Sequence, residues 1–215
     1  MLNNMLHITI ILLALSTLAL ANNNPVPIQK VQGIYLGAGA GLSYRNYQDS
    51  TQTYNTSTLS DTDTAYLLYG GYQLNKIIAV EASYRNYGSF SNTATGSIGG
   101  VRTFTNAPES YSVYVNTGYT FTNGLRPFGQ LGLGYTYFNT SSSSQDLGLT
   151  DGASFVFGLG LEYIPVELAG LGLRIAYVQD LTMNSSYTAD NHGKDIHIGR
   201  MNINAMFYVG AQYKF

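Results

Sequence analysis

The sequence has 215 residues, no cysteine and a formal net charge of −2, from ten Lys or Arg side chains against twelve Asp or Glu. This balance excludes a nucleic-acid binder that relies on phosphate neutralisation, and the missing cysteines exclude disulfide scaffolds, thiolate metal sites and cysteine nucleophiles. Charged residues make up only 10% of the chain, against about 25% in soluble domains, which is too few for an ordinary water-facing surface.

The N-terminal segment contains an apolar run from Ile8 to Leu18, followed by Ala19, Leu20 and Ala21. This pattern predicts a secretory signal peptide over residues 1–21, cleaved after Ala21. An uncleaved anchor is the alternative, but a membrane-spanning helix needs about 20 apolar residues and this run is shorter. We expect residues 22–33 to form a short periplasmic leader and residues 34–215 to form one folded domain.

The mature chain then alternates between apolar and small or polar residues. From Ile34 to Arg45, apolar side chains occupy the even positions, and glycine or polar side chains occupy most of the odd ones. Such alternation indicates a β-strand with one apolar face. Seven more segments repeat it, so the predicted strands are 34–45, 64–74, 77–87, 110–121, 128–138, 153–163, 171–180 and 201–215.

The connections between these strands alternate in length. Short links at 75–76, 122–125 and 164–170 alternate with long Ser-, Thr- and Asn-rich links at 46–62, 88–109, 139–151 and 181–199. Strands of about ten residues cross a bilayer when tilted, and short periplasmic turns with longer outside loops are typical of outer-membrane barrels. The sequence therefore predicts an all-β fold, an eight-stranded antiparallel up-and-down transmembrane β-barrel.

A soluble eight-stranded barrel of the lipocalin kind alternates in the same way, with its apolar face inward. In such a barrel, the alternate residues that include Glu81 and Arg174 would form the outer surface. This set of residues is dominated by glycine and holds few charges. That surface is too poorly charged for contact with water. In a narrow membrane barrel, by contrast, glycines facing the lumen make room for a few large polar side chains.

Several ionisable residues fall on the inward parity. Glu81 on the third strand and Arg174 on the seventh face each other across an eight-stranded barrel, so we expect them to pair and plug the lumen. The alternative is that they face trapped water without bonding. The predicted lumen charge network consists of Glu81, Arg174, Glu162, Arg45 and Arg85. Asp180 is also on the inward parity, near the outer end of the lumen.

Two segments carry a family resemblance. Residues 70–75, GGYQLN, followed by 80–84, VEASY, resemble the second hairpin of the small outer-membrane barrels that include the OmpA transmembrane domain and opacity-type surface proteins. The ending 208–215, YVGAQYKF, resembles the assembly signal of bacterial outer-membrane proteins, with Phe215 and Tyr213 on the apolar parity. Since the chain ends at the eighth predicted strand, we do not carry over the cell-wall tethering of longer family members.

The resemblance implies a location in the bacterial outer membrane, contact with its lipid and lipopolysaccharide, and insertion by the barrel-assembly machinery. It also implies roles from structural support to adhesion. We therefore expect a non-enzymatic protein that contacts a host or environmental ligand through four extracellular loops, and no nucleic acid. A small-solute channel is the alternative, and a lipid A-modifying enzyme is a weaker one.

Potential catalytic or metal-binding side chains gather only in the fourth long link, at His192, Asp195 and His197. Imidazole and carboxylate groups together can bind a metal ion or act as a base and its orienting partner. No further ligand or nucleophile stands at a defined spacing from them, and a polar surface loop explains the same residues. We therefore predict no catalytic residue, no metal site and no cofactor.

Overall fold

The computed structural model describes residues 31–48, 61–95, 101–139, 151–189 and 195–215. The predicted signal peptide, 1–21, and most of the predicted leader, 22–33, lie outside the described residues. The strands are β1 (Gly33–Gln48), β2 (Asp61–Gln73), β3 (Ile78–Asn86), β4 (Phe90–Thr95), β5 (Val101–Asn106), β6 (Glu109–Gly118), β7 (Leu125–Tyr137), β8 (Gly152–Tyr163), β9 (Leu171–Ala189) and β10 (Asp195–Lys214). A 3-10 turn, η2 (Val166–Leu168), lies between β8 and β9.

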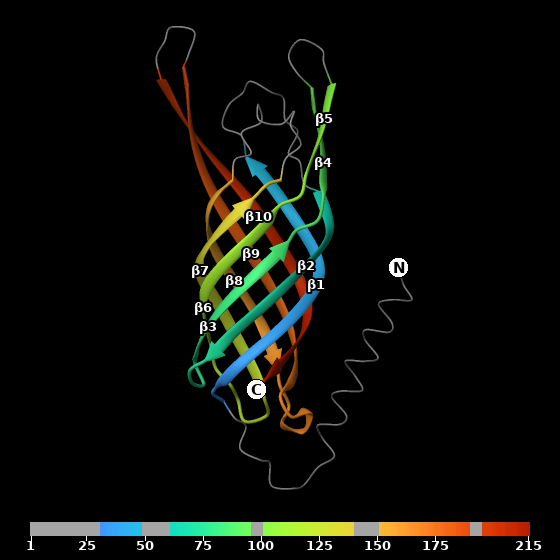
Figure 1. Ribbon diagram of the computed structural model, residues 1–215, viewed down its shortest axis with the longest axis vertical. Helices are drawn as coiled ribbons and strands as arrows, with labels where there is room; N and C mark the ends of the chain where they lie inside the picture. Colours follow the sequence, from blue (N-terminus) through green and yellow to red (C-terminus); the bar gives the residue numbers. More distant parts are fainter. Residues whose placement is uncertain (1–30, 49–60, 96–100, 140–150, 190–194) are drawn as a thin grey trace, which may run out of the picture.

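Eight of these strands close into one antiparallel barrel, in the order β1-β10-β9-β8-β7-β6-β3-β2 (Figure 1). The barrel is closed because β1 pairs with β2 on one side and with the last strand, β10, on the other. Closure leaves no unpaired sheet edge, which is what a strand structure needs inside a membrane. The predicted fold class and all eight predicted barrel strands are confirmed.

The two faces of the wall have opposite chemistry. Along β7, which pairs with β6 and β8, the Leu131 and Leu133 side chains are 69% and 63% exposed. Gln130 on the same strand is buried in the lumen. The same alternation holds around the barrel, with large apolar side chains outside and polar or aromatic ones inside. The structure is therefore apolar outside and polar inside, as predicted for a membrane barrel.

Glycines on the lumen side allow the narrow barrel to hold large side chains. A Cβ atom at Gly132 would lie 2.2 Å from the Val113 carbonyl oxygen and 2.3 Å from Tyr114 Cβ. Gly132 thus leaves room for Tyr114 on the neighbouring strand. Gly124 has a different reason: it adopts φ +84° in the turn before β7, a conformation that favours glycine.

The long links differ from the prediction in two places. The predicted loop 88–109 contains the two-stranded sheet β4–β5, and the predicted loop 181–199 is mostly strand, because β9 runs to Ala189 and β10 starts at Asp195. Figure 1 shows both hairpins projecting beyond the barrel at the end opposite the C terminus. Polar strands beyond the bilayer need no apolar face, so alternation could not reveal them. In the described ranges, no helix is long and apolar enough to cross a membrane.

Candidate functional site

The inner half of the lumen is organised around the carboxylate of Glu81 on β3. Glu81 is 1% exposed and accepts hydrogen bonds from Arg174 Nη1 at 2.9 Å, Tyr35 OH at 2.6 Å and Tyr114 OH at 2.5 Å. Gln130 Nε2 donates a fourth hydrogen bond at 3.1 Å. These donors come from four strands, β1, β6, β7 and β9, so one buried carboxylate on β3 links strands on several sides of the barrel.

Arg174 on β9 joins two carboxylates. Its Nη1 lies 2.9 Å from Glu81 Oε1, and its Nη2 lies 2.9 Å from Glu162 Oε2 on β8. The guanidinium carbon also lies 4.1 Å from the Tyr69 ring centroid and 4.9 Å from that of Phe128. Ion pairing and ring stacking therefore fix this fully buried cation in the middle of the lumen.

A second arginine, Arg126, completes the inner cluster. It donates to Asn116 Oδ1 at 2.8 Å, and its Nη1 lies 4.0 Å from Glu162 Oε2. The two arginines thus offset the charges of Glu81 and Glu162. Arg126 was missing from the predicted network because the predicted strand began at residue 128, whereas β7 begins at Leu125. Its parity, the same as that of Gln130, would have placed it inside had the strand been extended.

Polar side chains are hydrogen-bonded to one another at the periplasmic mouth of the lumen. Lys214 Nζ on β10 donates to Gln73 Oε1 on β2, and Gln73 Nε2 donates to Thr120 Oγ1 at 3.0 Å. Just inside, Tyr69 OH donates to Gln212 Oε1 at 3.1 Å. Around the barrel only β1 separates β2 from β10, so the Lys214–Gln73 and Tyr69–Gln212 bonds bridge over β1 at this end of the lumen.

The outer half of the lumen has its own ion pair. Arg85 Nη2 on β3 lies 2.8 Å from Asp180 Oδ1 on β9, and both side chains are fully buried. Arg85 also donates to Ser112 Oγ at 2.5 Å and to Ser83 Oγ at 3.0 Å. Tyr87 OH donates to Asp180 Oδ2 at 2.8 Å. These hydrogen bonds stabilise the two buried charges, which have no contact with water.

The predicted network is therefore divided between different places in the lumen. Glu81, Arg174 and Glu162 form the inner cluster, whereas Arg85 pairs with Asp180 further out. Arg45 lies at the outer end, with its guanidinium carbon 5.8 Å from each of two aromatic ring centroids, those of Phe90 and Phe138. Two layers of charge, each spanning from β3 to β9, thus cross the lumen at successive heights.

Other candidate residues lie elsewhere. His192 is outside the described residues, and the prediction that Asp195 and His197 belong to a loop is wrong, because both lie in β10 and pair with β9. Among the residues that the structure describes, no three His, Cys, Asp or Glu side chains are grouped to hold a metal ion. Tyr213 and Phe215 face outward at the end of β10, with ring centroids 4.9 Å apart.

No role in the lumen was predicted for aromatic side chains, although Tyr35, Tyr69 and Tyr114 stand on the parity that was predicted to face inward. Tyr35, Tyr69, Tyr114 and Tyr208 are all nearly fully buried inside the barrel. Tyrosine is also common on the lipid-facing wall, so residue type alone could not separate the two groups. Their position in the alternation separates them, because each tyrosine falls in the same alternate set as the small or polar residues of its strand.

Comparisons with known proteins agree with this geometry. The sequence pattern of a family described as "Outer membrane protein beta-barrel domain" matches residues 8–215. The fold is similar to that of the outer membrane protein OprG from Pseudomonas aeruginosa, with a TM-score of 0.57, 14% identity, and 87% of this chain and 99% of that chain covered. It is also similar to the outer membrane protein AlkL in lipid bilayers, with a TM-score of 0.50, 16% identity, and 91% and 97% covered. A comparison with curated protein sequences finds no match.

Proposed function

This chain belongs to the outer membrane protein β-barrel domain family and lies in the bacterial outer membrane, and we propose that it is a non-enzymatic surface protein. Its barrel is a closed support, and its four extracellular loops contact a host or environmental ligand. The observation that carries the proposal is that buried ion pairs fill the lumen. A barrel that is filled by paired charges leaves its projecting loops as the part that can meet a partner.

The inner cluster and the Arg85–Asp180 pair support closure for an energetic reason. A hydrated ion crossing the lumen would have to separate Arg174 from Glu81 or push past them, and Arg85 and Asp180 would present the same obstacle. Breaking a buried ion pair by removing one partner costs about 3–5 kcal/mol. Two such layers in series make steady ion flow through the unmodified barrel unfavourable.

The extracellular side supports a role in contact. The hairpins β4–β5 and β9–β10 extend the barrel wall outward (Figure 1). The sequences of the long links are rich in Ser, Thr and Asn and carry few charges. Such a surface recognises a partner through hydrogen bonds rather than through strong electrostatic steering.

Loop deletion tests the proposal. A variant in which residues 92–104 are replaced by a two-residue Asn-Gly turn removes most of the β4–β5 hairpin and leaves the barrel strands intact. Cells that display wild-type protein should adhere to epithelial monolayers and basement-membrane matrix, and the shortened variant should lose most of that adhesion. A matched deletion in the periplasmic link, residues 166–168, serves as the control. Equal adhesion with all four loops shortened would overturn the proposal.

Planar-bilayer conductance tests the rival function of a small-solute channel. We expect no steady conductance from the wild-type protein, and openings in a variant with Arg85→Ala and Arg174→Ala, which removes the large cations from both layers. Stable, large wild-type conductance would favour the channel instead.

Assembly by the barrel-assembly machinery belongs to the same proposal. Phe215 is 57% exposed at the end of the lipid-facing stripe of β10 and resembles the terminal residue of the family's signal. We expect Phe215→Ala to reduce the heat-modifiable barrel in outer-membrane fractions several-fold, whereas Lys214→Ala, on the lumen side, should change it less. Normal insertion of Phe215→Ala would argue against this assignment.

A further inference from the structure

The inner half of the lumen holds more positive than negative charge. Its buried ionisable side chains, each 8% exposed or less, are three cations and two carboxylates: Arg126, Arg174, Lys214, Glu81 and Glu162. The Arg174 guanidinium lies 2.9 Å from each carboxylate, and Arg126 Nη1 lies 4.0 Å from Glu162. The two arginines therefore balance the two carboxylates, and the charge of Lys214 is in surplus.

Lys214 lies at the periplasmic end of this half. Its ammonium group donates to the amide oxygen of Gln73, which is neutral, and it forms no ion pair with any residue that the structure describes. Glu162 and Arg126 both lie within electrostatic range of the ammonium group, so this one carboxylate faces three cations. A cation held away from water is strongly unfavourable without an anionic partner. The surplus charge is therefore best balanced by an anion at this end of the lumen.

Hydrogen-bond donors are also in surplus here. Gln212 Nε2, Arg126 Nε and Arg174 Nε are buried without an acceptor. The buried acceptor without a donor in this half is Gln130 Oε1, which lies further along β7, on the amide that donates to Glu81. Toward the periplasmic mouth, the unused polar groups of the described side chains are thus donors, and an anion accepts hydrogen bonds from such groups.

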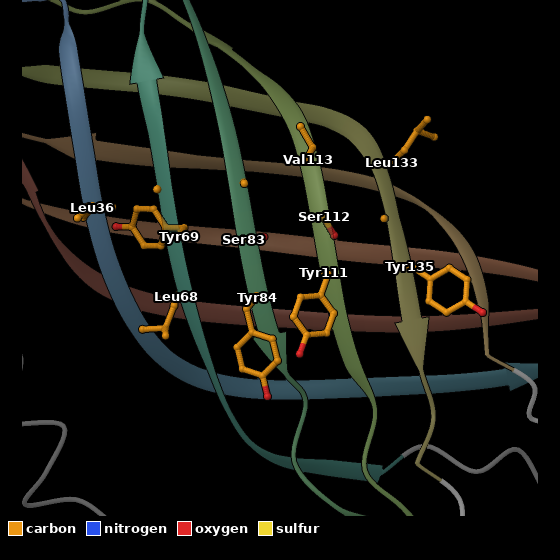
Figure 2. Close-up of a pocket in the computed structure, with 13 residues that line it drawn as sticks. Leu36, Leu68, Tyr69, Ser83, Tyr84, Tyr111, Ser112, Val113, Leu133 and Tyr135 are labelled. Carbon is orange, nitrogen blue, oxygen red and sulfur yellow. The ribbon is translucent and has the colours of Figure 1, made fainter.

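Gln212 is held in place by Tyr69. Its amide oxygen accepts a hydrogen bond from Tyr69 OH at 3.1 Å, which leaves the amide nitrogen as the free end. Figure 2 shows the Tyr69 ring pointing from β2 toward β1. A Cβ atom at Gly37 on β1 would lie 2.3 Å from Tyr69 Cζ, so glycine lets the ring cross β1 and reach Gln212 on β10. Lys214 is two residues further along β10, so the two side chains enter the lumen on the same face, about 7 Å apart.

We propose that the periplasmic end of the lumen binds one small oxyanion of the size of inorganic phosphate, held by Lys214, Arg126 and Gln212. Their donors come from β7 and β10, which two other strands separate around the barrel. A phosphate ion has several acceptor oxygens and can therefore receive hydrogen bonds from both strands at once. The Lys214 side chain is 8% exposed at the mouth, which gives the anion access from the periplasm.

Urea unfolding of the whole protein in dodecyl maltoside micelles, which contain no phosphate group, tests the proposal. An anion that binds only the folded barrel raises the unfolding midpoint. Inorganic phosphate should therefore raise the midpoint saturably, and further than sodium chloride of equal ionic strength. Lys214→Gln should increase the phosphate concentration needed for half of this effect at least tenfold. Lys76→Gln is the matched control, because it removes the same charge from the exposed turn between β2 and β3.

A second variant and a direct measurement keep the test decisive if Lys214→Gln does not fold. Gln212→Glu keeps the size of the side chain and supplies a carboxylate near Lys214, so the midpoint of this variant should no longer respond to phosphate. In nitrogen-15 NMR spectra of the wild-type protein, the Arg126 Nε–H and Gln212 amide resonances should shift with phosphate. The Nε–H resonance of Arg85, in the outer layer, should stay in place.

The proposal is overturned if Lys214→Gln and Lys76→Gln respond to phosphate alike, or if chloride acts as well as phosphate. Arg126 and Gln212 resonances that do not move would also overturn it, as would a Gln212→Glu barrel that responds like the wild type. None of these results depends on what the extracellular loops contact, so failure here would leave the proposed surface role unchanged.

Discussion

The lumen and the lipid-facing wall are built from alternate residues of the same strands, yet they differ in how they are held. Outside, Leu131 and Leu159 need only an apolar environment, and any large apolar residue would serve. Inside, Glu81 receives hydrogen bonds from Tyr35 and Tyr114 and an ion pair from Arg174. The lumen therefore depends on particular partners, whereas the wall depends on residue class. This difference predicts where substitutions are costly.

The largest effect should come from removing the central carboxylate. Glu81→Ala leaves Glu162 as the remaining ion-pair partner of Arg174 and removes the acceptor of the hydrogen bonds from two tyrosine hydroxyls. Removing one partner of a buried pair costs about 3–5 kcal/mol, so the free energy of unfolding should fall by that amount in urea titrations in lipid vesicles. Glu167→Ala, in the exposed periplasmic turn, should cost close to nothing.

A double-mutant cycle sharpens the same point. Glu81→Gln and Arg174→Gln should each destabilise the barrel, and the double variant should lose less than the sum, with a coupling of about 1–3 kcal/mol. Strictly additive losses would mean that the two groups do not act on each other, and the lumen would then resemble the wall in its tolerance.

On the wall, only a charge should be costly. Leu159→Arg, in the lipid-facing row of β8, should cost about 2–4 kcal/mol if it lies near the bilayer midplane. Leu171→Arg, at the periplasmic start of β9, should cost about 0–1 kcal/mol because the interface is wet. Refolding into vesicles measures both, and equal tolerance of the two would contradict the assignment of faces.

Two tyrosines three residues apart on β6 make a matched pair. Tyr114→Phe removes the hydroxyl that donates to Glu81 at 2.5 Å, and hydrogen bonds to charged groups contribute about 1.5–3 kcal/mol. Tyr111 faces lipid, so Tyr111→Phe should leave the free energy of unfolding nearly unchanged. If both variants lose the same stability, partner-specific packing in the lumen is not what distinguishes the faces.

The smallest predicted effects concern two glycines of β7. Gly132→Ala places a methyl group against Val113 and Tyr114 in the lumen and should cost about 1–3 kcal/mol through overpacking. Gly129→Ala faces lipid, where the nearest atom would lie 3.8 Å away, and should gain about 0.4–1 kcal/mol through lower chain entropy in the unfolded state. Thermal or urea unfolding that ranks them the other way would contradict the crowded-lumen description.

Much of this fold could be predicted because its strands keep strict alternation. The period of two assigns Leu133 to lipid and Gln130 to the lumen without any tertiary information, and eight such runs with alternating links are enough for an eight-stranded barrel. The projecting hairpin β4–β5 was not found, because its sequences, FSNTAT and VRTFTN, have no sustained alternation of apolar and polar residues. The missed start of β7 at Leu125 likewise removed Arg126 from the expected network.

What the sequence by itself determined is therefore which side chains face inward and which face lipid, since parity is a local property of an extended chain. Tertiary structure decided which inward groups meet. Closure between β1 and β10 and the register between strands place Arg174 between Glu81 and Glu162, and Arg85 beside Asp180. These contacts depend on pairings between residues far apart in the chain, which alternation within one strand cannot specify.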